Sequence, residues 1–216
     1  MYAKPQMQER VPQERAAVCA EALEYGLDQL GSSPRLADLE MLRDRGRLHE
    51  LLHAALEHMA LGDQHRPEWQ GNPWNWESLL DDGRTRVGVW TLFPSNPLPI
   101  HDEPGIGGLY IGLSGTVFQR RYQRSLATDL AEERAVTLRL VETRTISAGD
   151  WVDFGPDRNE IHCLAADHKP ATLFQVLISP ARPAVARHWF LPIRPYGADE
   201  TEVHALPFRR EPRGFA

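Results

Sequence analysis

The chain has 216 residues, a net charge of −6 and an isoelectric point near 5.8. This acidic balance argues against a nucleic-acid-binding protein, which usually presents a basic face. No apolar run approaches the roughly 18 residues that a transmembrane helix requires. The polar N-terminus lacks the apolar core of a signal peptide, and the two cysteines do not suggest a secreted disulfide scaffold. We therefore expect a cytoplasmic protein with no nucleic-acid or membrane partner.

Residues 1–80 are predicted to form a helical segment that packs on the rest of the protein. Apolar residues recur near a 3.6-residue period from about residue 12 to 30, and again from about 34 to 60. His49 and His53 lie one helical turn apart in the second of these helices. Metal sites can use that spacing, but an ordinary solvated or packing face explains it more simply.

Residues 81–216 are predicted to form a β-rich domain of short strands separated by turns. Just before it, residues 61–82 hold three tryptophans among polar residues, and these tryptophans need packing partners. The stretch could be a loop over the mouth of the barrel, although a structural plug explains it more simply. Residues 109–114 and 116–121 are predicted to form a hairpin. Strands at this spacing are typical of a sandwich or barrel. Others are expected near residues 86–93, 135–143, 161–165, 172–178, 188–192 and 203–207.

The most informative stretch is residues 99–105, with the sequence PIHDEPG. Side chains two apart in a strand point to the same face, so His101 and Glu103 are expected to enter one cavity. About sixty residues later, His162 lies in another predicted strand. Two imidazoles and one carboxylate leave open positions on a metal and suit a non-haem Fe(II) centre that binds O2. The sequence therefore predicts a metal site at these three residues.

Residues 99–105, together with 109–117 (LYIGLSGTV) and 158–164 (RNEIHCL), resemble the two-part metal motif of the cupin superfamily. They look most like the thiol dioxygenases related to cysteine dioxygenase and cysteamine dioxygenase. The resemblance covers roughly residues 76–180. It implies a double-stranded β-helix (cupin) barrel, preceded here by the helical segment.

The same resemblance implies a mononuclear non-haem iron oxygenase that uses O2 to oxidise the sulfur of a small thiol. Cysteine or a cysteine-like compound is the first substrate to consider, and the product would be a sulfinate or a rearranged S-oxidised compound. The thiol dioxygenases usually have a histidine where this chain has Glu103. An anionic ligand is expected to lower the redox potential of the iron, and it leaves nickel and manganese open as alternatives.

Five further residues are candidates for the site. The carboxylate-binding arginine of the family falls near Glu77, whose charge suits a substrate amine instead. Arg84 or Arg86 could bind a substrate carboxylate. Arg86 and Tyr110 are the candidate catalytic residues. Tyr110 and Trp90 are expected to line the cavity, although ordinary core packing explains such aromatic residues equally well.

Two other functions stay open at this stage. One is a cupin oxygenase or isomerase that acts on a non-thiol substrate, because two imidazoles and one carboxylate also suit carbon–carbon cleavage. The other is a cupin that binds a small ligand without turnover. The sequence is compatible with either a monomer or a homodimer.

Overall fold

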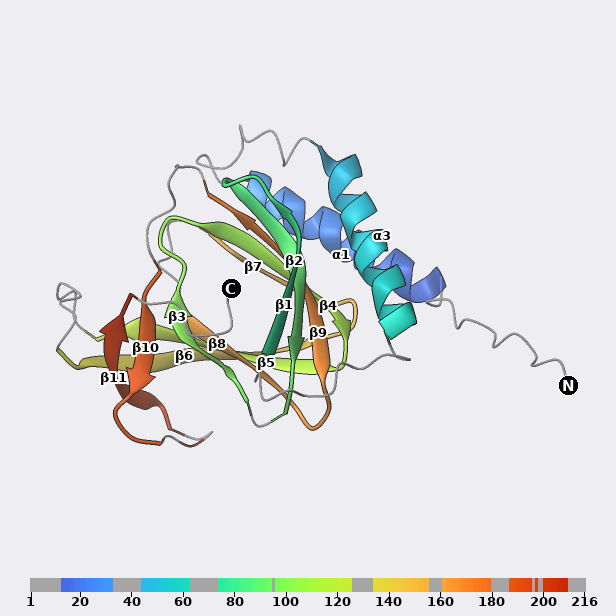
Figure 1. The fold of residues 1–216 in the computed structure, drawn as a ribbon. Helices are drawn as coiled ribbons and strands as arrows, with labels where there is room; N and C mark the ends of the chain where they lie inside the picture. The colour runs from blue at the N-terminus through green and yellow to red at the C-terminus, as the bar shows by residue number, and fades with distance from the viewer. Residues whose placement is uncertain are drawn as a thin grey trace, which may run out of the picture.

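Figure 1 shows the computed structural model of the protein, which describes residues 13–32, 44–62, 74–94, 96–125, 134–155, 161–179, 187–195, 197 and 200–209. Two antiparallel β-sheets face each other, and two helices lie against one of them. The predicted mainly β fold with an N-terminal helical segment is therefore confirmed. The elements are α1 (Gln13–Gly31), α3 (Arg45–Gly62), β1 (Trp74–Asp81), β2 (Thr85–Leu92), β3 (Leu98–Asp102), β4 (Gly107–Ser114), β5 (Thr116–Arg124), β6 (Val136–Ser147), β7 (Trp151–Phe154), β8 (Ile161–Ala166), β9 (Ala171–Ile178), β10 (Trp189–Pro192) and β11 (Glu202–Phe208).

The strand pairing is that of a double-stranded β-helix. The first sheet has the order β1-β2-β9-β4-β7, and the second has the order β10-β11-β6-β5-β8-β3. Across the two sheets the pairs are nested, because β2 pairs with β9, β3 with β8, β4 with β7 and β5 with β6. The chain thus forms one long hairpin whose successive pairs alternate between the sheets. This eight-strand arrangement is the jelly-roll architecture found in cupins.

The predicted hairpin of β4 and β5 is wrong, because the two strands belong to different sheets. β4 pairs with β7 and β9, whereas β5 pairs with β6 and β8. The turn between them carries the chain across, with Gly115 at a φ of 68°. A Cβ at Gly115 would lie 2.6 Å from the Pro170 carbonyl oxygen, so glycine permits both the positive φ and the close approach.

The predicted boundary at residue 80 falls inside β1, which pairs with β2 along its length. The tryptophan-rich stretch therefore ends in a strand rather than remaining a loop throughout. Trp74 and Trp76 are two residues apart in β1 and share the face that packs toward the second sheet. The Trp76 ring lies against Trp90, with ring centroids 4.9 Å apart. Trp69 lies outside the described residues.

The first sheet is buried on both faces. On its outer face, α1 and α3 pack against alternate residues of β2, β4 and β9, including Val87, Ile111 and Val176. On its inner face, the intervening residues, including Tyr110 and Leu177, pack toward the second sheet. Burial on both faces explains why β4 and β9 are continuous apolar runs rather than alternating strands.

The second sheet closes into a ring, because β10 pairs with both β11 and β3. Its inside holds a separate apolar cluster that includes Ile100, Tyr122 and Phe190. Its other face turns toward the first sheet. Since side chains alternate along a strand, His101, next to Ile100, points out of the ring and into the space between the sheets.

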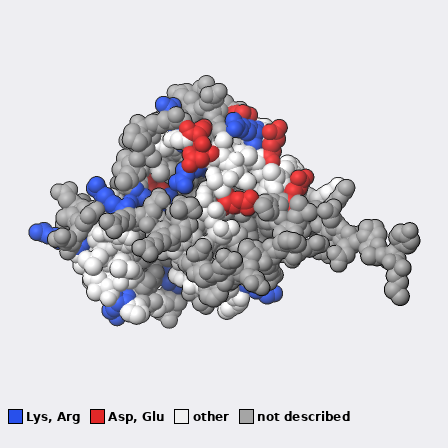
Figure 2. Space-filling view, in the orientation of Figure 1, with Lys and Arg blue, Asp and Glu red and all other residues white. Residues whose placement is uncertain are grey.

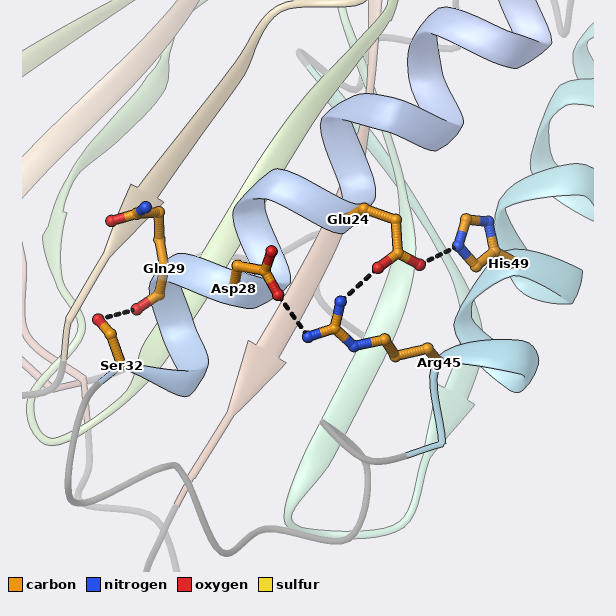
Figure 3. Close-up of polar contacts among 6 residues, drawn as sticks. All are labelled: Glu24, Asp28, Gln29, Ser32, Arg45 and His49. Atoms are coloured by element: carbon orange, nitrogen blue, oxygen red, sulfur yellow. Dashed lines mark hydrogen bonds and ion pairs between the residues drawn. The ribbon is translucent and has the colours of Figure 1, made fainter.

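The two helices are also joined by charged side chains at their exposed edge (Figure 3). Arg45 of α3 forms ion pairs with Glu24 and Asp28 of α1, and His49 Nε2 lies 2.5 Å from Glu24 Oε1. His49 therefore serves helix packing, and His53 is exposed.

Within the described part of the chain, no helix has the length and apolar character needed to cross a membrane. On the face in Figure 2, the described acidic and basic side chains are interspersed.

Candidate metal centre

The structure brings the three predicted ligands together between the two sheets. His101 on β3 and His162 on β8 are Cα partners, and their ring centroids lie 4.5 Å apart. Glu103 follows β3 by one residue. One ligand atom from each of the three residues lies within 4.8 Å of the others, and all three side chains are buried. Strand pairing thus supplies the distant histidine, and two-residue spacing supplies the local pair.

The ring of His101 is oriented by a backbone carbonyl. Its Nδ1 lies 2.8 Å from the Pro99 carbonyl oxygen, to which an Nδ1–H donates. This hydrogen bond orients the ring so that its Nε2 faces Glu103, whose Oε1 is 3.5 Å away. Metal-bound histidines are typically fixed by such a bond from the other ring nitrogen, because it sets both the tautomer and the ring plane.

Two buried atoms of the cluster have no hydrogen-bond partner among the described residues, namely His162 Nδ1 and Glu103 Oε2. Burial, and then the charge of His101, lowers the pKa of His162 well below its ordinary value, so this imidazole is neutral at pH 7. Burying unpaired polar atoms costs free energy. A cation that accepts electron pairs from these groups would remove that cost, so the residues present fit a metal ion.

The remaining oxygen of Glu103 is held by Arg187, which forms an ion pair with Oε1. Burial by itself would raise the pKa of Glu103. The charge of Arg187, followed by the hydrogen bond and charge of His101, outweighs burial and lowers this pKa to about 2. Glu103 is therefore an anion at neutral pH and is available as a metal ligand.

We expect these two residues to make the stability of the metal-free protein depend on pH. Because the pKa of Glu103 is about 2 in the fold and 4.5 ordinarily, ionised Glu103 stabilises the fold above pH 4.5. That contribution, on the order of 3 kcal/mol, is lost as the pH falls from 4.5 toward 2. His162 acts in the same direction, because below pH 6.5 the unfolded chain binds its proton while the fold resists protonation.

Urea titrations of the metal-free protein at fixed ionic strength measure this dependence. The free energy of unfolding is expected to decrease as the pH falls below 6.5. Below pH 4.5, this decrease should be smaller in the Glu103→Gln variant than in the unmodified protein. Equal slopes below pH 4.5 in the two proteins would contradict the low pKa of Glu103.

Aromatic side chains form the walls around the cluster. The Trp189 ring lies 4.8 Å from His101, and the Phe154 ring lies 5.7 Å from His162 by centroid distance. The Tyr110 hydroxyl lies 3.1 Å from His162 Nε2, so this predicted residue does lie at the site. Such walls exclude water and lower the local dielectric constant, which strengthens electrostatic interactions inside.

Trp90 also faces the space between the sheets. Its Nε1–H donates to Gln175 Oε1 at 2.8 Å, and both side chains are buried. Gln175 is the Cα partner of Tyr110 in the neighbouring strand β4. Trp90 therefore lies close to the wall that carries Tyr110 and contributes to its packing.

The other three predicted residues are not brought to the cluster. Glu77 is the Cα partner of Val89, which packs toward the helices, so Glu77 lies on the face of the sheet opposite Tyr110. Arg84 is exposed in the turn between β1 and β2. Arg86 pairs with Asp81 at 3.4 Å, and its side chain is 41% exposed. The register of β1 and β2 therefore points the charges of Glu77 and Arg86 away from the candidate metal ligands.

Two residues at the site were missed by sequence reasoning. Arg187 precedes β10, and nothing local indicates that β10 pairs with β3. Gln119 on β5 is fully buried, and both atoms of its carboxamide lack a partner among the described residues. It shares a strand face with Arg121, the Cα partner of His162. A polar residue at an inward position of a strand was the available signal for Gln119.

Comparison with known proteins adds little to this geometry. No family model and no curated protein matches the chain. Among solved structures, a cupin superfamily protein from Desulfitobacterium hafniense is 12% identical, covers 50% of this chain and 79% of its own, and has a TM-score of 0.37.

Two other solved structures match to a similar extent. A Klebsiella pneumoniae protein with a double-stranded β-helix domain is 17% identical over 56% of this chain and 89% of its own, with a TM-score of 0.38. An oxalate oxidase in complex with the substrate analogue glycolate is 15% identical over 53% of this chain and 55% of its own, with a TM-score of 0.39. At this level of likeness, the assignment of the protein to the double-stranded β-helix fold rests on its own strand pairing.

Proposed function

We propose that the protein is a mononuclear metal-dependent oxygenase that uses O2 to oxidise the sulfur of a small thiol. The observation that carries the proposal is the buried cluster of His101, Glu103 and His162, in which two ligand-type atoms lack partners among the described residues. Fe(II) is the metal that best suits two imidazoles and one carboxylate around open positions. Cysteine or a cysteine-like compound is the first substrate to test.

Bound iron would supply adjacent open positions at which a thiolate and O2 can react. The overall reaction adds both oxygen atoms of O2 to sulfur and gives a sulfinate, so its atoms and electrons balance without another reductant. The protein contributes the three ligands, a dry aromatic wall, and polar groups beside them. Gln119, with a donor and an acceptor unpaired among the described residues, supports a substrate whose far end is polar.

Tyr110 is placed to act on a group bound beside His162, because its hydroxyl is 3.1 Å from His162 Nε2. Removing only that hydroxyl, in Tyr110→Phe, is expected to lower kcat on the order of 100-fold while iron content stays stoichiometric. Steady-state O2 uptake together with iron analysis of the same sample checks this. An unchanged kcat would show that Tyr110 is only a wall residue.

The function is tested by O2 uptake of anaerobically Fe(II)-loaded protein given L-cysteine, cysteamine or 3-mercaptopropionate, with mass spectrometry of the product. Uptake with a product heavier by two oxygen atoms supports the proposal. A matched pair of variants makes the test specific. His162→Ala should abolish uptake, whereas His168→Ala, whose side chain is 92% exposed, should not.

A non-thiol oxygenase is the second candidate, and the carboxylate ligand Glu103 favours it, since thiol dioxygenases usually have a histidine there. Bound iron without O2 uptake on any of the three thiols would contradict the thiol proposal and favour this alternative. Iron that is retained without turnover of any substrate class would instead indicate a ligand-binding protein.

A further inference from the structure

The segment that leads into β10 runs antiparallel to the end of β3 and faces the metal ligands. Trp189 and His101 are Cα partners, and their rings lie 4.8 Å apart by centroid distance. Glu103, two residues after His101, meets Arg187, two residues before Trp189, in the ion pair. Because alternate side chains share a face, both pairs point into the space between the sheets.

The residues between these two pairs form a clamp. The His188 backbone N–H donates to Asp102 Oδ1 at 2.6 Å, and the His188 ring lies with Nδ1 2.9 Å from Oδ2. The Asp102 N–H donates to the His188 carbonyl oxygen at 3.0 Å. Arg209 Nε–H donates to His188 Nε2 at 3.4 Å, which leaves the ring proton on Nδ1 to bond Asp102. These bonds hold the Arg187 segment against the metal-ligand segment.

Arg187 is also restricted by its own contacts. Its guanidinium lies over the Trp189 ring, 5.4 Å from the centroid, and its side chain is only 12% exposed. A cation held over an indole face gains electrostatic attraction and loses rotamer freedom. Arg187 therefore presents a fixed positive charge to Glu103 Oε1, while Glu103 Oε2 has no partner among the described residues and is left to a metal ion.

We propose that Arg187 is a positioning residue that orients the Glu103 carboxylate for the metal and offsets its negative charge. This inference rests on the metal centre of the proposed function. Two imidazoles, which bind a metal ion in their neutral form, one carboxylate and one adjacent guanidinium sum to no net charge. In a buried site with a low dielectric constant, such neighbouring charges act strongly on a bound ion. The ion would therefore experience a charge environment close to that of three neutral ligands, despite its anionic ligand.

The redox potential of the Fe(III)/Fe(II) couple, measured by anaerobic titration without thiol, tests this charge balance. Arg187→Met is expected to lower the potential, because the carboxylate charge is no longer offset. Glu103→His in the otherwise unmodified protein is expected to raise it, because Arg187 is then uncompensated. The double variant is expected to return close to the unmodified protein. Arg194→Met, which removes an arginine from an exposed pair with Glu200, is the matched control and should change nothing.

An unchanged potential in Arg187→Met, or an equal shift in Arg194→Met, would overturn the proposal. Should Arg187→Met fail to fold, Arg187→Gln and Arg187→Lys replace it, with Gln expected to lower the potential and Lys to keep it near the original value. The outcomes separate the two proposals. If the redox potentials shift as expected but no thiol is oxidised, only the thiol activity is contradicted. If thiol is oxidised but the potential of Arg187→Met is unchanged, only the role of Arg187 is contradicted.

Discussion

Replacing His162 with alanine is expected to lower the affinity for Fe(II) by more than about 100-fold, beyond the usual effect of losing an outer-shell partner. The physical reason is that His162 supplies one of three ligands, and its neighbours cannot replace it. The pKa of His162 is held low by burial, so this ligand does not have to lose a proton to bind the metal between pH 6.5 and 8.

Chelator competition with Fe(II), repeated with Co(II) as a spectroscopic probe, measures this affinity. His168→Ala is the matched control, because its imidazole is 92% exposed and lies outside the cluster. Comparable metal affinity in His162→Ala and the unmodified protein would contradict the metal centre, and with it the oxygenase proposal. A loss of affinity with normal far-ultraviolet circular dichroism would show that the effect is local.

Replacing Asp102 with alanine is expected to destabilise the protein by about 3 kcal/mol, the usual cost of leaving one partner of a buried polar pair unpaired. Asp102 is buried and accepts hydrogen bonds from both the backbone and the ring of His188. Its loss would leave two buried donors unsatisfied and would release the segment that carries Arg187. A weaker affinity for Fe(II) should therefore accompany the lower stability.

Urea unfolding of the metal-free proteins measures the change in free energy. Asp167→Ala is the matched control, because Asp167 makes the same kind of aspartate–histidine contact, at 3.3 Å, with the exposed His168. An exposed pair of this kind contributes at most about 1 kcal/mol. If the two variants were equally stable, Asp102 and His188 would not act as a clamp.

The ligands of the candidate metal site could be predicted from sequence because the information is local. His101 and Glu103 share a face through the two-residue period of a strand, and His162 lies in a short apolar segment that had to be a strand. Short apolar runs between turn signals located β2, β8 and β9 within one residue of their observed bounds. Burial on both faces made these segments apolar enough to recognise.

The substrate-side residues could not be placed in the same way. Charge and a rough match to a known family predict Glu77 and Arg86 as substrate-binding or catalytic residues. Neither of these signals reveals the register in which β1 pairs with β2. That register turns Glu77 toward the helices and leaves Arg86 with Asp81 at the surface. The polar residues between the tryptophans of β1 hide its alternation, so the sequence does not predict this strand.

By itself, the sequence determined the mainly β fold and the N-terminal helical segment, and its resemblance to a two-part metal motif indicated the three candidate ligands. Only the tertiary structure decided that β4 and β5 lie in different sheets, and that Arg187 reaches Glu103 from 84 residues away. The physical reason is that strand periodicity depends on neighbouring residues. The choice of partner strand depends on how the whole hairpin winds and closes, which no short stretch of sequence contains.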